Sequence, residues 1–164
     1  MLGNEVVITG KRAFARSFAK INLTLDVTGK REDGYHNVEM VMQSVSLFDF
    51  IIAEKCEDGI KLSTNLKYLP VNEKNIAYKA AMMFFEYTGI KGGIKLTVRK
   101  NIPVAAGLAG GSGNCAAVLC LMNKLYNAGL STEELCALGA KCGADVPYCI
   151  FAETMLASGI GDLL

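Results

Sequence analysis

The residues best suited to chemistry form a glycine-rich stretch in the second half of the chain. Four glycines fall within residues 107–113, and an apolar periodicity typical of a helix begins directly after them. Glycine adopts positive φ readily and lets a ligand approach the backbone closely. A helix N-terminus adds free N–H groups and the positive end of the helix dipole. The stretch therefore predicts an anion site suited to phosphate, and the alternative is a flexible loop whose glycines permit tight packing.

Two familiar phosphate-binding motifs can be compared with this stretch. The P-loop requires a lysine directly after its last glycine, and no lysine follows here. A dinucleotide fingerprint matches residues 111–116, but that fingerprint belongs directly at the end of a strand, and about ten residues separate it from Val98, where a strand is expected to end. The first motif is absent and the second match is weak.

The sequence holds six cysteines and a single histidine, His36. No two cysteines form a C-x-x-C pair, so a zinc site is not expected. Several cysteines lie at apolar positions of helix-like segments, where they act as small hydrophobes and fit a reducing compartment. Cys115 is the exception, because it lies near a predicted helix N-terminus that would lower the pKa of a thiol. A catalytic thiol would need His36 as its base, and nothing in the sequence places the two together.

Composition excludes several classes of protein. The 164 residues include 17 basic and 16 acidic side chains, and the net charge of +1 offers no field for steering nucleic acid or an anionic membrane. With 51% hydrophobic residues the chain is not disordered. Its apolar runs fall short of the ~18 residues that a membrane span needs. Charged residues also interrupt any N-terminal leader pattern. We therefore expect a soluble, cytoplasmic globular protein without nucleic-acid or membrane partners.

The segments that position the glycine-rich stretch begin with strands. From 21 to 28 apolar and polar residues alternate strictly, which predicts a half-buried strand. Asp33 and Gly34 predict a turn after it. Two further strands are predicted over residues 38–42 and 48–52. Residues 57–59 predict a hairpin turn, which leads into another strand over 60–62.

Helices follow among later strands. Asn75 is the predicted N-cap of a helix that runs to Tyr87 and ends at Gly89. A strand is predicted over 94–98, and the helix after the glycines places Ala117, Leu121 and Leu125 on one face.

The last third of the chain predicts one more helix and a strand region. A capping box over 131–134 opens a short helix that Gly143 closes, and 147–156 predicts one or two short strands. The order of elements indicates an α+β or mixed α/β fold. The apolar ending Leu163-Leu164 is typical of an interrupted chain.

Four ordered motifs, at 19–25, 33–36, 103–112 and 143–147, resemble those of the GHMP kinases, the galactokinase, homoserine, mevalonate and phosphomevalonate kinase superfamily. The resemblance runs from about Ala13 to the last residue. It implies the N-terminal lobe of that fold, shared with part of a ribosomal protein: a strand-rich first half with helices packed on one face of the sheet. Residues 1–164 would form this ATP-binding domain, without the second lobe that family members carry.

The same resemblance implies two catalytic residues. Asp145 matches the acidic residue that takes the proton from the substrate hydroxyl. Lys20 matches its partner, which holds that carboxylate ionised and offsets charge on the transferring phosphoryl group. Phosphoryl transfer depends mainly on positioning and charge neutralisation, so these residues and a phosphate loop suffice chemically. Without the family match, each residue would more often be part of a turn or a solvated face.

Binding residues are implied in the same way. Tyr35 and His36 match positions that hold a cytidine, and Asn22 lies on the strand face of Lys20, where it could donate to the substrate. Ser112 could reach a phosphate or Mg²⁺, although the family usually has a second serine where Gly113 stands. Asn75 matches a position near the adenosine, with helix N-cap as the simpler role. The residues expected to bind ATP are Asn75, Pro103, Gly107, Leu108, Ala109, Gly110, Gly111, Ser112 and Gly113.

The function implied by the resemblance is that of an ATP-dependent, Mg²⁺-using kinase. Within the family, the motifs are closest to the branch that phosphorylates the 2-hydroxyl of a cytidine-diphosphate-linked methylerythritol in non-mevalonate isoprenoid synthesis. The alternative is a truncated, inactive nucleotide-binding or structural module of the same fold, whose activity would fail for want of a second lobe. A small RNA-binding domain is a third interpretation, which the near-zero net charge disfavours.

Overall fold

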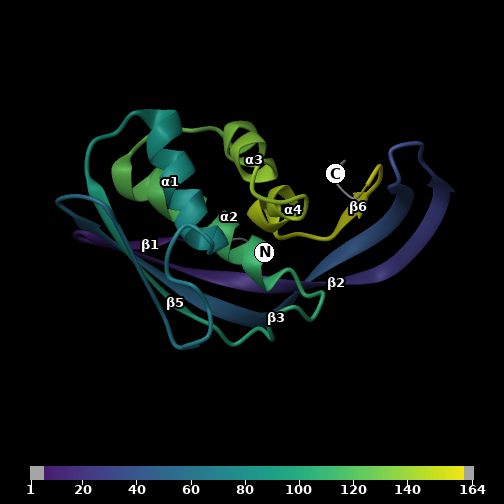
Figure 1. Ribbon diagram of the computed structural model, residues 1–164, viewed down its shortest axis with the longest axis horizontal. Coiled ribbons are helices and arrows are strands. Elements are labelled where there is room, and N and C mark those ends of the chain that lie inside the picture. The colour runs from purple at the N-terminus through teal and green to yellow at the C-terminus, as the bar shows by residue number, and fades with distance from the viewer. Residues whose placement is uncertain (1–5, 161–164) are drawn as a thin grey trace.

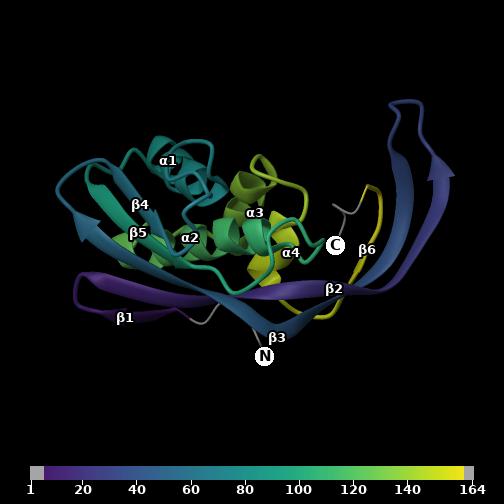
Figure 2. The same cartoon turned by 60° about the horizontal axis from the view of Figure 1, so that its bottom comes forward.

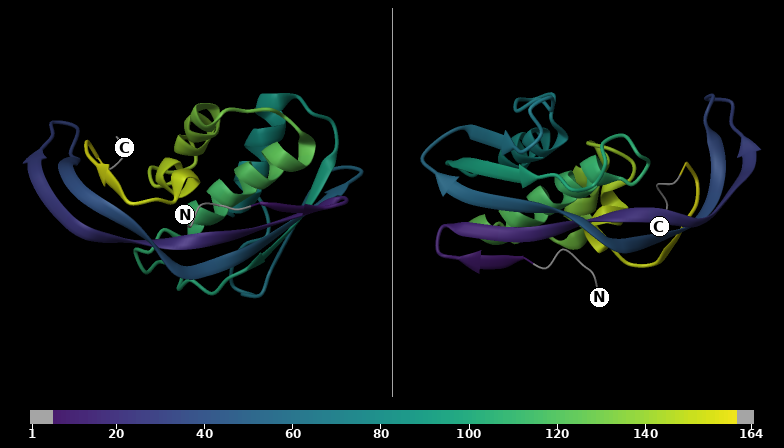
Figure 3. Two further views of the ribbon diagram at one scale, coloured as in Figure 1. Left: turned by 180° about the vertical axis from the view of Figure 1, so that it is seen from behind. Right: turned by 90° about the horizontal axis from the view of Figure 1, so that it is seen from below.

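The computed structural model describes residues 6–160 and consists of one mixed sheet with four helices on one of its faces (Figures 1 and 3). This confirms the α+β fold class. The strands are β1 (Val7–Thr9), β2 (Arg12–Lys30), β3 (His36–Cys56), β4 (Ile60–Thr64), β5 (Gly93–Arg99) and β6 (Met155–Ala157). The helices are α1 (Ile76–Thr88), α2 (Gly110–Tyr126), α3 (Thr132–Ala140) and α4 (Val146–Phe151).

The sheet has the strand order β1-β2-β3-β5-β4, and β6 pairs with another stretch of β3. The predicted hairpin at 57–59 is wrong. Gly59 makes a turn with φ of 69°, but β4 pairs with β5 in parallel and not with β3. The reason is that β5 occupies the adjacent edge of β3 from Phe50 to Cys56. Helix α1 supplies the crossover that a parallel pair requires.

Strands β2 and β3 form a long arm that extends beyond the helices and curves toward the side of the sheet that carries them (Figures 1 and 2). The two strands predicted over 38–42 and 48–52 are one continuous strand, in which the pairing shifts register between Phe18 and Ala19 of β2. Such a bulge bends a strand without ending it, and it shifts the alternation of the two faces.

The strand predicted over 21–28 exists, but its half-buried character is wrong. Leu23 is 56% exposed and Val27 is 60% exposed, because this part of β2 extends beyond the helices. A second register shift between Asn22 and Thr24 sets Ile21 opposite Gln43 and Leu25 opposite Met40. Since side chains alternate along a strand, the apolar positions on the two sides of this bulge point to opposite faces of the sheet.

Both predicted ends of α1 are confirmed, whereas the predicted end of α3 is wrong. The Asn75 side chain accepts the N–H of Ala77 at 3.0 Å, and Gly89 ends the helix in the left-handed conformation, as expected. The capping box that opens α3 is also confirmed, but α3 ends at Ala140 with Lys141 as its cap, before Gly143.

The strands predicted over 147–156 are largely wrong. Residues Val146–Phe151 form helix α4, with Pro147 in its first turn, where the missing proline N–H costs no hydrogen bond. Ala152 then adopts a left-handed conformation that ends the helix. Within the described residues the short strand β6 follows, so apolar composition alone did not distinguish a short buried helix from a strand.

The core lies between the sheet and the helices, and α2 is its centre. From Gly113 to Leu119 every residue of α2 is buried, which explains the small and apolar side chains of that segment. Within residues 6–160 no helix is long and apolar enough to cross a membrane.

Candidate functional site

A cavity of about 380 Å³ lies between the glycine-rich loop, the start of α1 and the start of α2. Its walls include eight of the nine residues that sequence reasoning assigned to ATP: Asn75, Pro103, Gly107, Leu108, Ala109, Gly110, Gly111 and Ser112. The ninth, Gly113, does not line it. Mostly apolar walls with a few polar groups at one end are typical of small-ligand sites.

The loop turns sharply before it enters the helix. Ala105, Gly107 and Ala109 all have positive φ, with values of 59°, 73° and 54°. Helix α2 begins at Gly110, so the last glycines of the stretch form its first turn. No side chain caps this end, and no acidic residue lies in its first turn. The N–H groups and the positive end of the dipole are therefore available to an anion.

The glycines of the first turn serve different purposes. A Cβ at Gly111 would meet only Ile76 Cγ2, at an ordinary 3.6 Å. A Cβ at Gly110 would lie 2.9 Å from Ile102 Cγ2, and one at Gly113 would lie 2.6 Å from Ser17 Oγ on β2. Gly110 and Gly113 are thus required by packing, whereas a Cβ at Gly111 would make only an ordinary van der Waals contact.

Lys20 and Asn22 lie together on β2, as the strand periodicity predicts. The Lys20 Nζ donates to Asn22 Oδ1 at 2.9 Å, and the Lys20 side chain is largely buried. The backbone N–H of Lys20 also donates to the carbonyl of Leu108 at 3.2 Å. One residue therefore joins the β2 strand to the glycine-rich loop.

Asp145 is half-buried directly before α4, and both Asp145 and Lys20 act electrostatically on Cys149. The pKa of the Cys149 thiol is raised to about 12, chiefly by burial and also by the charge of Asp145, while Lys20 acts to lower it. A Cβ at Gly143 would lie 3.8 Å from Ser112 Oγ. In the described part of the chain Asp145 and Lys20 form no ion pair, so the fold brings them around one thiol without direct contact.

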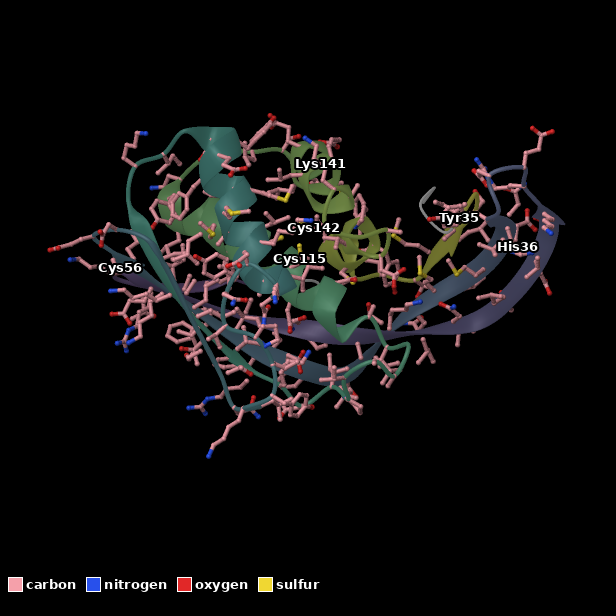
Figure 4. All side chains as sticks on the ribbon, in the orientation of Figure 1. Tyr35, His36, Cys56, Cys115, Lys141 and Cys142 are labelled. Carbon is pink, nitrogen blue, oxygen red and sulfur yellow. The ribbon has the colours of Figure 1, made fainter. Side chains whose placement is uncertain are left out.

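Tyr35 and His36 lie at the tip of the arm, far along β2 and β3 from the helices (Figure 4). Tyr35 is 62% exposed, and its backbone N–H donates to Asp33 Oδ1 at 3.1 Å. This hydrogen bond is the main cause of a lowered pKa for Asp33, to which Arg31 adds. The structure does not bring these two side chains to the cavity.

A buried polar cluster beneath the loop escaped the sequence analysis. Asp49 on β3 and Lys100 at the end of β5 form an ion pair, and Asn114 of α2 contacts both. Lys100 also lines the cavity. The available signals were weak: a lone aspartate between phenylalanines, and a lysine that follows an alternating strand.

The expectation for Cys115 is wrong. Its thiol pKa is raised well above the ordinary value, first by a hydrogen bond to Cys142 and then by burial, because Cys115 lies on the core side of α2. The same hydrogen bond, helped by Lys79, lowers the pKa of the half-buried Cys142 to about 7. Figure 4 shows both cysteines among the helices and His36 at the arm tip, so no Cys–His pair forms.

Metal ligands are scarce around the cavity. Residues 6–160 hold no cluster of three or more His, Cys, Asp or Glu side chains that could bind an ion. Among the cavity-lining residues, Ser112 is the one suggested for Mg²⁺, and it offers a single hydroxyl.

Comparison with known proteins identifies the fold and its relatives. Residues 75–153 match the family described as GHMP kinases N terminal domain. A 4-diphosphocytidyl-2-C-methyl-D-erythritol kinase of Clostridium botulinum (strain Eklund 17B / Type B) is 54% identical over 147 residues, which cover 90% of this chain and 52% of the relative. The kinase of the same name from Clostridium novyi (strain NT) is 51% identical over 149 residues, 91% of this chain and 53% of the relative.

Solved structures agree with the sequence relatives. A crystal structure of 4-(cytidine 5'-diphospho)-2C-methyl-D-erythritol kinase matches with a TM-score of 0.82 and 36% identity, over 92% of this chain and 53% of that protein. The mevalonate kinase of Methanococcus jannaschii matches with a TM-score of 0.62 at 21% identity, over 82% of this chain and 47% of that protein, which shows a shared fold alone. The chain spans about half the length of the curated relatives it matches.

Proposed function

We propose that this chain, whose residues 75–153 match the N-terminal domain of the GHMP kinases, binds ATP and serves in phosphoryl transfer to the 2-hydroxyl of 4-diphosphocytidyl-2-C-methyl-D-erythritol. The observation that carries the proposal is the uncapped first turn of α2, whose residues Gly110, Gly111 and Ser112 line a cavity. The 54% identity to a kinase of this name supports the choice of substrate.

The nucleotide is proposed to lie in the cavity with its phosphates at the first turn of α2. Free backbone N–H groups and the helix dipole favour the negative phosphate oxygens there. Both ends of the Asn75 amide are already used, since Oδ1 accepts from Ala77 and Nδ2 donates to the Pro70 carbonyl at 2.8 Å. Asn75 would therefore shape the wall of the nucleotide site through its cap, with little hydrogen-bonding capacity left for adenosine.

Mg²⁺ is proposed to enter with the nucleotide. Magnesium sites of kinases are built from substrate phosphates, waters and one or two protein oxygens, so a missing carboxylate cluster does not conflict with them. Ser112 is the residue that would hold the ion, by its hydroxyl at the phosphate end of the cavity. The ion would neutralise charge between phosphate oxygens.

For the transfer step, Asp145 is proposed as the group that accepts the hydroxyl proton. Its carboxylate has no hydrogen bond from another described side chain, so it is free to accept one from a substrate. Lys20, fixed by Asn22, would offset negative charge nearby, and Asn22 would donate to the substrate. Tyr35 and His36 at the arm tip are proposed to bind the cytidine end.

The domain assignment is also a proposal: residues 1–164 would form the N-terminal, ATP-binding half of a cytoplasmic kinase that acts on this small molecule and not on nucleic acid or membranes. Exposed apolar side chains along β2 would then be covered by a second lobe. Leu163 and Leu164, whose apolar side chains led to the prediction of an interrupted chain, lie outside the described residues.

The test is phosphoryl transfer from ATP to 4-diphosphocytidyl-2-C-methyl-D-erythritol, measured with this chain alone and mixed with the C-terminal half of the Clostridium botulinum relative. Where transfer is seen, Asp145→Asn should lower kcat by a factor of about 10² to 10⁴, because it removes the general base while keeping its shape. Glu57→Gln, in an exposed turn, is the matched control. Unchanged kcat in Asp145→Asn would refute the role of Asp145, and ATP binding without transfer in either setting would favour the inactive nucleotide-binding module.

A further inference from the structure

The polar cluster beneath the glycine-rich loop joins four separate segments of the chain. Asp49 Oδ1 accepts the backbone N–H groups of Asn101 and Ile102 at 2.7 and 2.9 Å. Its Oδ2 accepts from the Lys100 ammonium and, at 2.8 Å, from the Asn114 amide. Both oxygens of one carboxylate are thus saturated by the segment that enters the loop and by the helix that leaves it.

Asn114 connects this ion pair to the first turns of α2. Its Oδ1 accepts from Lys100 Nζ at 3.0 Å, and its Nδ2 donates to Ser17 Oγ of β2 at 3.2 Å as well as to Asp49. Asn114 is 4% exposed. An amide suits this position, because its oxygen accepts from the ammonium while its NH₂ group has two protons, one for the carboxylate and one for Ser17, and a hydroxyl has a single proton to donate.

The Lys100 ammonium lies directly behind the phosphate-binding turn. A Cβ built on Gly110 would be 3.1 Å from Lys100 Nζ, so the ammonium lies beside the space that a side chain at the first residue of α2 would take. Its side chain is 5% exposed and Asp49 is fully buried. Because the pair is neutral overall, it adds little long-range attraction for an anion, and its effect on a ligand acts through the position of the turn.

We propose that Lys100, held by Asp49 and Asn114, is a positioning residue for phosphate binding: it fixes the register between the end of β5, the glycine-rich loop and the first turn of α2. This inference rests on the proposed nucleotide site. Small displacements of such a turn weaken hydrogen bonds steeply, since N–H···O geometry tolerates little change in distance or angle. A ligand without phosphates does not use the turn and should not depend on the cluster.

The experiment compares ATP with adenosine as ligands of the 164-residue chain, by equilibrium binding. Asn114→Ala keeps the ion pair and removes its connection to α2. The double variant Asp49→Asn with Lys100→Met removes both charges together, so that no buried charge is left unpaired, and retains an oxygen for the Asn101 and Ile102 N–H groups. Leu138→Ala, in the core of α3 and away from the cavity walls, is the control for loss of stability alone.

The expected result is a rise in the ATP dissociation constant of about tenfold or more in both cluster variants, the effect of one lost hydrogen bond to a charged group. The adenosine dissociation constant should stay within a factor of about two, and Leu138→Ala should bind both ligands normally while unfolding at lower urea concentration. Unchanged ATP affinity, or an equal loss for ATP and adenosine, would overturn the positioning role. Failure of the unsubstituted chain to bind ATP would instead overturn the nucleotide site, and with it this inference.

Discussion

Gly111→Ala is the sharpest test of the phosphate site, because it should weaken ATP binding without lowering the free energy of unfolding. The added methyl would meet only Ile76 Cγ2, at 3.6 Å, and Gly111 has no positive φ. Alanine is favoured over glycine in a helix by about 0.5 to 1 kcal/mol, with less expected in the first turn. The free energy of unfolding should therefore stay the same or rise slightly.

The ligand should respond in the opposite direction. A phosphate at the first turn takes hydrogen bonds from its N–H groups and needs close approach to the backbone at Gly111. Displacing it from one such bond costs about 1.5 to 3 kcal/mol, which corresponds to a dissociation constant about tenfold to 150-fold higher. Isothermal titration calorimetry with ATP measures this, and adenosine should bind as before.

Two further glycines make the comparison specific. Gly29→Ala, on the arm with nothing within 4 Å of the added methyl, is the control and should leave ATP affinity unchanged. Gly110→Ala is a poorer probe, because its methyl would collide with Ile102 and reach the Lys100 ammonium, so stability and binding would fall together. Equal ATP affinity in Gly111→Ala and the unsubstituted chain, with intact folding, would refute the placement of the phosphates.

Three further predictions use other parts of the molecule. Alkylation of Cys142 by iodoacetamide should rise as the pH passes through about 7, because its lowered pKa makes the thiolate available at a lower pH than in an ordinary cysteine. Lys79→Met should move that midpoint upward. A midpoint near 9 in the unsubstituted chain would contradict the Cys115 hydrogen bond. Gly113→Ala should lower the free energy of unfolding by about 1 to 3 kcal/mol in a urea titration, because its methyl would lie 2.6 Å from Ser17 Oγ. Asn75→Ala should cost about 1 kcal/mol through loss of the α1 cap, and no change in the urea midpoint would show that the cap contributes nothing.

Local signals in the sequence were sufficient where one residue decides the structure. The Asn75 cap, the left-handed Gly89 and the capping box of α3 each satisfy backbone groups within a few residues, so their pattern is visible in the sequence. The glycine-rich stretch belongs to the same class, since backbone freedom followed by a helix start is a local property. This explains why the loop and the helix start that follows it were predictable without a structure.

Long-range features were not predictable from the same patterns. The partner of β4 depends on which strand occupies the edge of β3, and no local signal records that choice. The exposure of β2 beyond residue 20 depends on how far the helices extend over the sheet, although its alternation is that of a half-buried strand. The short helix α4 has an apolar composition that strands share.

The Cys115 pKa shows why a local rule can also give the wrong sign. Proximity to a helix N-terminus lowers a thiol pKa only where the thiolate meets the free N–H groups or a positive charge. Cys115 lies on the core side of α2, where burial and a hydrogen bond donated to Cys142 both favour the neutral thiol. The direction in which a side chain points decided the outcome, and the fold sets that direction.

The site combines the two kinds of information, because locally specified parts are held together by long-range contacts. The loop is recognisable from its glycines, but its position relative to Lys20 depends on a backbone hydrogen bond from β2 to Leu108. The segment that enters the loop is held by Asp49 of β3, which accepts the N–H groups of residues 101 and 102. Gly143, two residues before Asp145, lies beside the loop, since a Cβ built on it would be 3.8 Å from Ser112 Oγ. Phosphoryl transfer requires its groups to be placed within about 1 Å of a productive geometry, so contacts that join separate elements matter as much as the groups themselves. Substitution of Asp49, a connecting residue that belongs to no recognisable motif, should therefore affect ligand binding as well.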